Sequence, residues 1–346
     1  MSKTQEKRRK KIEECSKKKF WYCRSLFGYN NVHFWLIVGP RDFGKSYSVM
    51  DRFIREFKTQ GKPFYWLRLT DKIAQSMLQN NAAKMVDEDL RRKYDLELTV
   101  KGNDVFDHGV KMAEVMGISA FYNMKGTATF DCEWKKGYNI CLDECQREVG
   151  EAVRFDLSYA LVNTLENYVR DTKEKLRIVF ICNYTETVSD ILNLFNFIPR
   201  TPGIYHLASK KAVVYMMPLT ETYIERRKGA VANILMPNAS TFTNEKVFDT
   251  SLVYEGKLIR PKLIIHFGDE KFTLWEGNKA DNVIKSFCNE KVPTIAMKPY
   301  IDGTSFRQPS AKNVFDIFDA RGFRFKDLIT QQRFTLALSR TKARNS

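Results

Sequence analysis

Short, almost continuously apolar runs recur through the first two hundred residues of the chain. They cover residues 34–38 (FWLIV), 64–69 (FYWLRL), 138–142 and 176–182. Runs of this length without a polar face are typical of strands that are covered on both sides in a parallel sheet. The pattern therefore predicts four buried strands in a mostly parallel core.

The segment between the first two runs has the spacing of an amphipathic helix. Its apolar residues fall three or four positions apart: Val49, Met50, Phe53, Ile54 and Phe57. Gly61 and Pro63 are signals that end such a helix. Strand, helix and strand then form a βαβ unit, whose crossover is right-handed.

Two further segments lie between the second and fourth runs. Residues 71–94 look helical, and residues 96–116 alternate around an Asp107-His108-Gly109 turn, which predicts a hairpin inserted into the α/β body. A long helix before the fourth run is indicated by one apolar face: Leu157, Ala160, Leu161, Thr164, Leu165 and Tyr168.

The texture of the sequence changes after Pro199. Turn residues and charges follow, and from about residue 240 short alternating strands dominate, ahead of a helical tail. We predict four parts: a basic arm (1–24), an α/β domain (25–200), a linker region (201–239) and a β-rich domain with a basic tail (240–346).

The charge of the chain is concentrated at its two ends. The chain has 346 residues, 57 basic and 41 acidic, for a net charge of +16. Residues 1–24 contribute +7 (ten basic, three acidic) and residues 321–346 contribute +6 (seven basic, one acidic). Both ends are therefore candidates for contact with a polyanion.

Composition excludes several classes of protein. An apolar content of 43% argues against global disorder, and no apolar run reaches the length of a membrane span. The seven cysteines have no paired spacing, and the leucine and aspartate beside Cys141 and Cys145 suggest a strand end rather than a zinc site. We expect an intracellular protein with reduced thiols.

A complete phosphate-binding motif, GxxxxGKS, lies between the first predicted strand and its helix. Its residues are Gly39, Pro40, Arg41, Asp42, Phe43, Gly44, Lys45 and Ser46. The backbone N–H groups of such a loop and the helix N-terminus bind phosphates, the lysine reaches the β- and γ-phosphates, and the serine hydroxyl binds Mg²⁺. The motif predicts a site for ATP and Mg²⁺. Arg41, inside the loop, faces a partner or DNA in this interpretation.

The third run ends in two acids, Asp143 and Glu144. At the carboxyl end of a strand beside the phosphate loop, Asp143 would hold Mg²⁺ and Glu144 would polarise the attacking water. Two adjacent acids favour hydrolysis over phosphoryl transfer to a small molecule. We therefore predict an α/β P-loop ATPase of the ASCE type with a mostly parallel central sheet.

Two further site residues are less strongly indicated. Asn183 follows the fourth strand, where it would sense the γ-phosphate or the lytic water. An arginine from a neighbouring subunit often stabilises the transition state. Arg170, at the end of the long helix, is our candidate for this trans-acting finger, and Arg147 and Arg154 compete with it.

These motifs, taken in order, resemble the DNA-packaging (encapsidation) ATPases of small podophages related to phage phi-twenty-nine. The resemblance rests on five stretches: LIVGPRDFGKSYSVM, FYWLRL with Arg68, GISAFYNMKGTATF, LDECQRE and YVRDTKEKLRIVFICN. It extends more weakly to the tail and covers most of residues 30–340. The long basic arm departs from the resemblance, because a member of that family has a shorter N-terminus.

The resemblance implies roles for several residues. Lys45 and Ser46 would bind the nucleotide phosphates, Asp143 and Glu144 would hold Mg²⁺ and activate water, and Arg170 would be the trans finger. Lys125 would act on the neighbouring subunit's nucleotide. The C-terminal domain would resemble a vestigial RNase H-like nuclease without its catalytic acids.

The function implied is an ATP-driven ring that moves double-stranded DNA into a procapsid in the host cytoplasm. Its partners would be duplex DNA, the portal (connector) and other copies of the chain in a pentamer, with a structural RNA as a further candidate and no membrane. A helicase or mobilisation-type ATPase would share the same motifs, and a non-catalytic DNA-tethering protein is a further alternative. Candidate contacts with the DNA backbone are Lys7–Lys11, Lys17–Lys19, Lys210, Lys211, Arg226–Lys228, Arg333, Arg340, Lys342 and Arg344.

Overall fold

The computed structural model divides into two compact units, which we describe separately. The first comprises Met1–Arg147, Asp156–Thr185 and Pro199–Lys246, and the second Glu148–Phe155, Glu186–Ile198 and Val247–Ser346. The structure describes residues 3–16, 21, 24–118, 139–145, 161–162, 165, 176–183, 190–199, 201–228, 251–267, 270–278, 282–286, 300–302 and 322–345. Most of the helix predicted around residues 157–168 lies outside these ranges.

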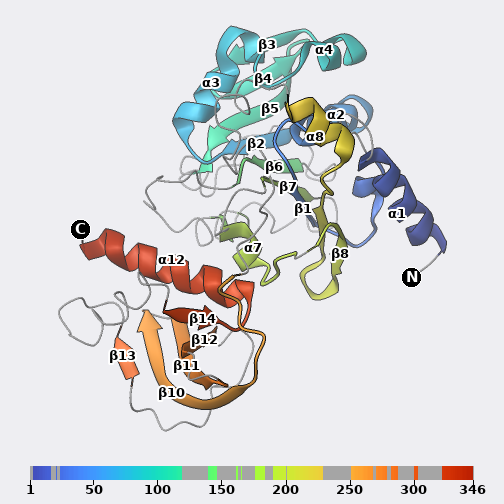
Figure 1. The fold of residues 1–346 in the computed structure, drawn as a ribbon. Helices are drawn as coiled ribbons and strands as arrows, with labels where there is room; N and C mark the ends of the chain where they lie inside the picture. Colours follow the sequence, from blue (N-terminus) through green and yellow to red (C-terminus); the bar gives the residue numbers. More distant parts are fainter. Residues whose placement is uncertain are drawn as a thin grey trace. The chain divides into compact units, whose positions relative to one another are not determined.

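The first unit is built on a nine-stranded sheet in the order β3-β4-β5-β2-β6-β7-β1-β9-β8. The strands are β1 (Phe34–Val38), β2 (Phe64–Arg68), β3 (Leu98–Lys101), β4 (Asp104–Asp107), β5 (Val110–Gly117), β6 (Asn139–Asp143), β7 (Arg177–Cys182), β8 (Gly203–Leu207) and β9 (Ala212–Met216). The run from β5 to β9 is parallel throughout. The predicted mostly parallel α/β core is therefore confirmed, and Figure 1 shows its strands beneath α2.

The hairpin predicted around residues 107–109 is present. β4 pairs antiparallel with β5, and His108 and Gly109 form the turn with positive φ angles. β3 adds to the same antiparallel edge. Because β5 also pairs in parallel with β2, this hairpin extends the central sheet instead of forming a separate insertion.

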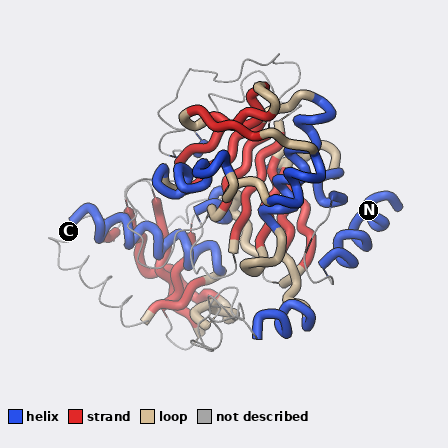
Figure 2. The backbone as a smooth tube through the Cα atoms, turned by 90° about the horizontal axis from the view of Figure 1, so that it is seen from above, coloured by secondary structure: helices blue, strands red, loops and turns tan. Residues whose placement is uncertain are grey.

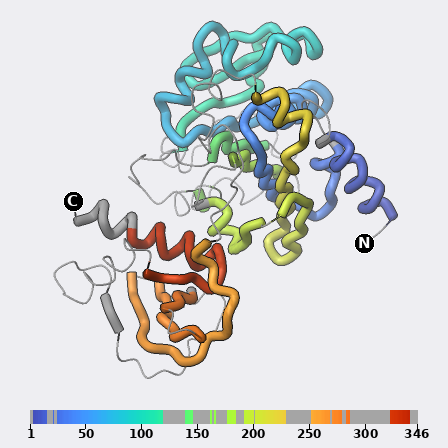
Figure 3. Tube along the Cα trace, in the orientation of Figure 1, coloured from blue at the N-terminus to red at the C-terminus, as the bar shows by residue number. Residues whose placement is uncertain are grey.

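The linker predicted for residues 201–239 is wrong over its first half. β9 pairs in parallel with β1, and β8 pairs antiparallel with β9, so that residues 203–216 form one edge of the central sheet (yellow-green in Figure 3). All five residues of β9 are buried. The run AVVYM supplied that signal, but the surrounding proline, glycine and lysines masked it.

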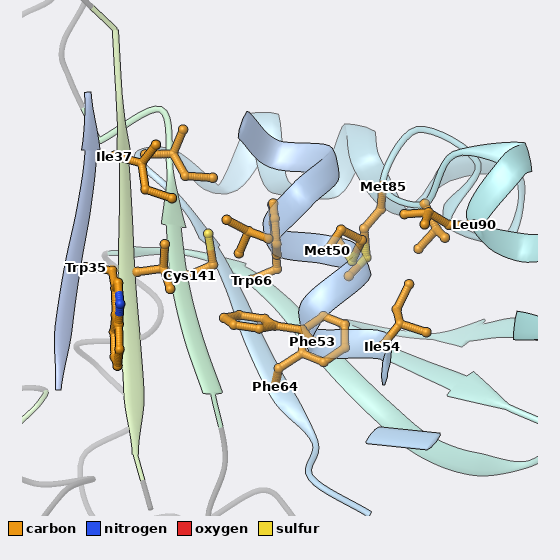
Figure 4. Close-up of a cluster of buried hydrophobic side chains, with 14 of the residues drawn as sticks. Trp35, Ile37, Met50, Phe53, Ile54, Phe64, Trp66, Met85, Leu90 and Cys141 are labelled. Atoms are coloured by element: carbon orange, nitrogen blue, oxygen red, sulfur yellow. The ribbon is translucent and has the colours of Figure 1, made fainter. Parts of the chain in front are cut away.

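Helix α2 (Lys45–Gln60) packs its apolar face on the sheet. Figure 4 shows Phe53 of this helix beside Phe64 and Trp66 of β2, with ring centroids 5.5 and 6.3 Å away. Gly61 ends the helix in a left-handed conformation, and its N–H bonds to the last turn as a C-cap should. This packing fixes the helix that begins inside the phosphate loop.

The described residues of the first unit form four more α-helices. They are α1 (Lys3–Ser16), α3 (Asp71–Ala82), α4 (Glu88–Tyr94) and α8 (Glu221–Lys228), and short 3-10 turns occur at Arg24–Gly28 and Ala208–Lys210. The segment predicted as helical over residues 71–94 forms α3 and α4, and near the end of α3 Asn80 and Asn81 adopt left-handed conformations, which asparagine tolerates. Figure 2 shows helices (blue) alongside the strands (red). Within the described ranges, no helix is long and apolar enough to cross a membrane.

The second unit contains a five-stranded sheet in the order β13-β10-β11-β12-β14. Its elements are β10 (Leu258–Phe267), β11 (Glu270–Gly277), β12 (Asn282–Ser286), β13 (Tyr300–Asp302), β14 (Phe323–Phe325), α7 (Asp190–Leu194) and α12 (Leu328–Asn345). Phe334 of α12 is fully buried and meets the rings of Phe267, Phe272, Phe323 and Phe325. The predicted β-rich domain and helical tail are thus joined in one small core.

Candidate functional site

The phosphate-loop motif and the predicted acids meet at one edge of the central sheet. The loop follows β1, Asp143 is the last residue of β6, and Asn183 follows β7. These three strands are parallel, with β7 between β1 and β6. Their carboxyl ends therefore open on the same crevice, where ligands of α/β sheets bind.

Lys45 is folded back over its own loop. Its Nζ donates to the backbone oxygens of Gly39 (2.8 Å) and Pro40 (2.5 Å) and to Oδ1 of Asn183 (3.1 Å). Burial lowers the pKa of Lys45 to about 8, although Asp143 and other anionic neighbours oppose the shift. A buried ammonium with a lowered pKa is one that phosphate oxygens would stabilise.

Ser46 and Asp143 are joined directly. The Ser46 hydroxyl donates to Oδ1 of Asp143 at 3.0 Å. Burial raises the pKa of Asp143, and Glu144 raises it further, against the opposing effects of Arg68, Ser46 and Lys45. A hydroxyl and a carboxylate are hard oxygen ligands of the kind Mg²⁺ prefers, and a cation there would offset the cost of burying Asp143. The donor set therefore fits Mg²⁺.

Arg68, at the end of β2, bridges the acid pair. Its Nη1 donates to Oδ2 of Asp143 at 3.0 Å and its Nη2 donates to Oε2 of Glu144. Glu144 is half exposed and has a φ of 53°, a left-handed conformation that is uncommon for glutamate. In this arrangement one oxygen of the Glu144 carboxylate accepts from the Arg68 guanidinium.

The loop itself requires both of its glycines. Gly44 has a φ of 94°, and a Cβ there would lie 2.5 Å from the carbonyl oxygen of Trp21. A Cβ on Gly39 would lie 2.4 Å from the sulfur of Met217. A side chain at Gly44 would clash with backbone and require a strained conformation, and one at Gly39 would have to displace the Met217 side chain.

Trp21 covers the start of helix α2. The backbone N–H of Trp21 donates to the backbone oxygen of Phe43 (2.7 Å), and the backbone oxygen of Trp21 accepts from the Ser48 hydroxyl (3.1 Å). Its buried ring packs near Tyr215 of β9, with ring centroids 5.8 Å apart. A residue of the predicted basic arm is thus part of the wall of the phosphate loop.

The sequence of the chain matches a known protein family. A model of the Podovirus DNA encapsidation protein (Gp16) family matches residues 15–256 of this chain, well over half of its length. The chain belongs to this family. A search of curated protein sequences found no match.

Two solved structures have a similar fold to this Gp16-family chain. The phi-28 gp11 DNA packaging motor is 16% identical, with a TM-score of 0.66 over 92% of this chain and 98% of that one. The bacteriophage phi-29 viral genome packaging motor assembly is also 16% identical, with a TM-score of 0.64 over 94% and 99%. At this identity the likeness establishes the fold, and the resemblance to podophage packaging ATPases is confirmed by the family match.

Not every predicted site residue of this Gp16-family chain can be placed. Lys45, Ser46, Asp143, Glu144 and Asn183 come together as described above. The predicted trans-acting residues all lie outside the described ranges: Lys125, Arg147, Arg154 and Arg170.

The predicted DNA contacts have varied surroundings. Arg226 and Arg227 bond to Asp42 of the phosphate loop, and Arg333 pairs with Glu270. Most of the basic residues of α1 are exposed, as are Lys210 and Lys211. Lys17–Lys19 and the side chains of Arg340, Lys342 and Arg344 lie outside the described ranges.

Sequence reasoning gave no role to Arg68 or Trp21, and it assigned the arginines of α8 to contact with DNA and not to the phosphate loop. One signal for Arg68 was present, because it is a charged residue that closes a buried strand, as Asp143 does. The contacts of Trp21 and Arg226 with the loop span more than 20 and more than 180 residues of sequence. No local pattern indicates pairs so far apart.

Proposed function

We propose that this chain is a subunit of a motor that hydrolyses Mg-ATP to move double-stranded DNA into a procapsid. The observation that carries the proposal is the junction of Ser46 with Asp143 and of Lys45 with Asn183 at the ends of β1, β6 and β7. Membership of the DNA encapsidation family supports the proposal that this chemistry serves DNA packaging.

Each residue at this junction has a task in the proposal. The loop amides and Lys45 bind the phosphates, Asn183 orients the γ-phosphate or the water, and Ser46 and Asp143 hold Mg²⁺. When bound, Mg²⁺ neutralises phosphate charge and positions the phosphate oxygens. Glu144 polarises the attacking water, and Arg68 competes with that water for the carboxylate. The order β1-β7-β6, with a strand between the loop strand and the acid strand, supports the ASCE type.

A second subunit completes the site in this proposal. Arg170 enters as the trans finger, Lys125 acts beside it, and Arg147 and Arg154 remain the competing candidates. The subunits form a ring, a pentamer by family analogy, on the portal at the procapsid vertex in the host cytoplasm. A structural RNA is a further candidate partner.

The second unit is proposed to descend from an RNase H-like nuclease. Its three antiparallel strands β10, β11 and β12 support a common origin with such sheets. Two of its described acids, Glu270 and Glu276, are paired with Arg333 and Arg260. Among the residues that the structure describes, no group of three or more His, Cys, Asp or Glu side chains could hold a metal ion.

One experiment tests the motor directly. ATP hydrolysis is measured with and without duplex DNA for the wild type and for Glu144→Gln. We expect DNA to stimulate the wild type and the variant to bind ATP without turnover. A wild type that hydrolyses ATP at the same rate without DNA would contradict a motor, and displacement of one strand of the duplex would favour the helicase alternative.

A further inference from the structure

Helix α8 lies against the phosphate loop. It is eight residues long (Glu221–Lys228) and is drawn in yellow in Figure 1. Tyr223 is buried, and its ring meets the edge of Phe43 at a centroid distance of 5.2 Å. Phe43 is itself fully buried, so the variable middle of the GxxxxGKS motif packs on this helix.

Three polar contacts join α8 to consecutive residues of the loop. The Tyr223 hydroxyl donates to the backbone oxygen of Arg41 at 3.0 Å. Arg226 Nη2 donates to the backbone oxygen of Asp42, and Arg227 Nη1 donates to its carboxylate at 2.7 Å. The guanidinium of Arg226 also lies over the ring of Tyr223, 5.4 Å from its centroid.

Together with the backbone N–H of Trp21, the side chains of α8 bind three successive peptide groups of the phosphate loop. Donors from outside the loop bind the carbonyl oxygens of Arg41, Asp42 and Phe43 in turn. A trans peptide is planar, so its N–H points away from its C=O. Fixing these three carbonyls therefore aims the amides of Asp42, Phe43 and Gly44 in the opposite directions, away from α8 and Trp21.

Those amides belong to the part of the loop that binds phosphate. In a phosphate loop, consecutive N–H groups form the anion-binding concavity. Their orientation would otherwise have to be fixed by the anion itself, at a cost in conformational entropy. Asp42 is also left-handed (φ 57°), a conformation that the contact with Arg227 helps to hold.

We propose that Tyr223 and Arg226 of α8, together with the backbone of Trp21, are positioning residues that orient the amides of residues 42–44 for phosphate binding. The inference rests on the proposed nucleotide site. It also gives Arg226 and Arg227 a role in the first unit that differs from the predicted grip on DNA.

The test compares Tyr223→Phe, Arg226→Gln and Arg226→Lys with the wild type. Tyr223→Phe keeps the ring contact with Phe43 and removes only the donor. Arg55→Gln is the matched control, because Arg55 is an exposed residue of α2 whose loss also removes one guanidinium. Thermal unfolding of each variant checks that the first unit remains folded.

Two measurements are made on the full-length chain. The Kd for Mg-ATP and the KM and kcat of hydrolysis are determined for each variant. Hydrogen exchange of peptides that contain residues 41–46 is followed without nucleotide. A hydrogen bond worth about 1 kcal/mol corresponds to about a fivefold change in Kd.

We expect Tyr223→Phe and Arg226→Gln to raise Kd and KM about fivefold each, with a smaller change in kcat, because the amides bind phosphate in both ground and transition states. We expect Arg226→Lys to recover part of the affinity and Arg55→Gln to match the wild type. Both loop variants should also exchange the 41–46 amides faster without nucleotide.

The outcomes separate the two ideas. If the wild type neither binds nor hydrolyses ATP, the proposed function is wrong and this inference is overturned with it. If the wild type binds ATP and both variants bind it equally well, only the positioning role is overturned. Unchanged exchange of residues 41–46 in the variants would also overturn it, whatever the nucleotide result.

Discussion

Glu56 joins the far end of helix α2 to the amino ends of two strands that carry site residues. It is buried, accepts from Asn139 Nδ2 at 2.8 Å, and is paired with Arg177 and with Arg52 (2.6 Å). Asn139 begins β6 and Arg177 begins β7. We predict that Glu56→Gln destabilises the first unit, since it removes the carboxylate that holds these elements together.

The size of the expected loss of stability follows from the burial of Arg177. Arg177 is only 14% exposed, so Glu56→Gln leaves its guanidinium buried without its carboxylate partner. Breaking one side of a buried ion pair costs about 3 to 5 kcal/mol. The glutamine can still accept a hydrogen bond from Asn139, so we expect the lower value, about 3 kcal/mol.

The effect depends on pH with a definite sign. Burial alone would raise the pKa of Glu56, but Arg177 and Arg52 hold it below its ordinary value of 4.5. The ionised Glu56 therefore stabilises the first unit above pH 4.5, and this contribution is lost as the pH falls through the lower folded pKa. The difference between wild type and Glu56→Gln should shrink in that acidic range.

Native-state hydrogen exchange suits this test, because the chain has two units and one global transition would mix them. Peptides from β6 and β7 should exchange about a hundredfold faster in Glu56→Gln, the equivalent of about 3 kcal/mol. The control is Arg260→Gln, which removes one member of an exposed pair (Arg260 is 73% exposed) and should change stability by less than about 0.5 kcal/mol. The reasoning would be refuted if Glu56→Gln lost as little stability as the control at pH 7. It would also be refuted if the stability difference between Glu56→Gln and the wild type did not shrink in acid.

Three more predictions concern other parts of the chain. Arg68→Gln should raise basal ATP hydrolysis relative to the DNA-stimulated rate by up to about fivefold. The reason is that the partly exposed ion pair between Arg68 and Glu144 is worth up to about 1 kcal/mol. An unchanged ratio of the two rates in steady-state assays would count against this role. Gly44→Ala should lower the melting temperature and weaken Mg-ATP binding at least about tenfold, because it adds about 1 to 2 kcal/mol of left-handed strain to a clash with the Trp21 carbonyl; wild-type binding by calorimetry would contradict it. Phe334→Ala should destabilise the second unit by about 3 to 5 kcal/mol, seen as faster exchange in its strands and not in the first unit.

Local pattern was sufficient for the elements that carry the site. β1, β2, β6 and β7 are continuous apolar runs, and their ends supplied the loop, the acid pair and Asn183. Such strands are found because burial on both faces removes every polar position from them. The same reasoning placed α2, whose buried face has the period of a helix.

The local sequence pattern could not predict which strands lie next to one another in the sheet. The sequence does not reveal that β9 lies beside β1, since only the sheet order brings residues 212–216 to that edge. The bridge from Arg68 to both acids likewise depends on β2 lying next to β6. Trp21 was assigned to a basic arm because charge dominates its neighbours, whereas its buried ring and backbone contacts place it on the loop.

The division of the chain into two units has a topological consequence. The chain passes between them five times, at 147/148, 155/156, 185/186, 198/199 and 246/247. Helix α7, from the middle of the sequence, therefore belongs to the unit that is otherwise C-terminal, and its Ile191 and Leu192 are fully buried. A chain cut after residue 246 would retain Glu148–Phe155 and Glu186–Ile198, the latter with α7, but lose Val247–Ser346 of the same unit. The two units are interleaved in sequence, so neither can be obtained intact by a single cleavage.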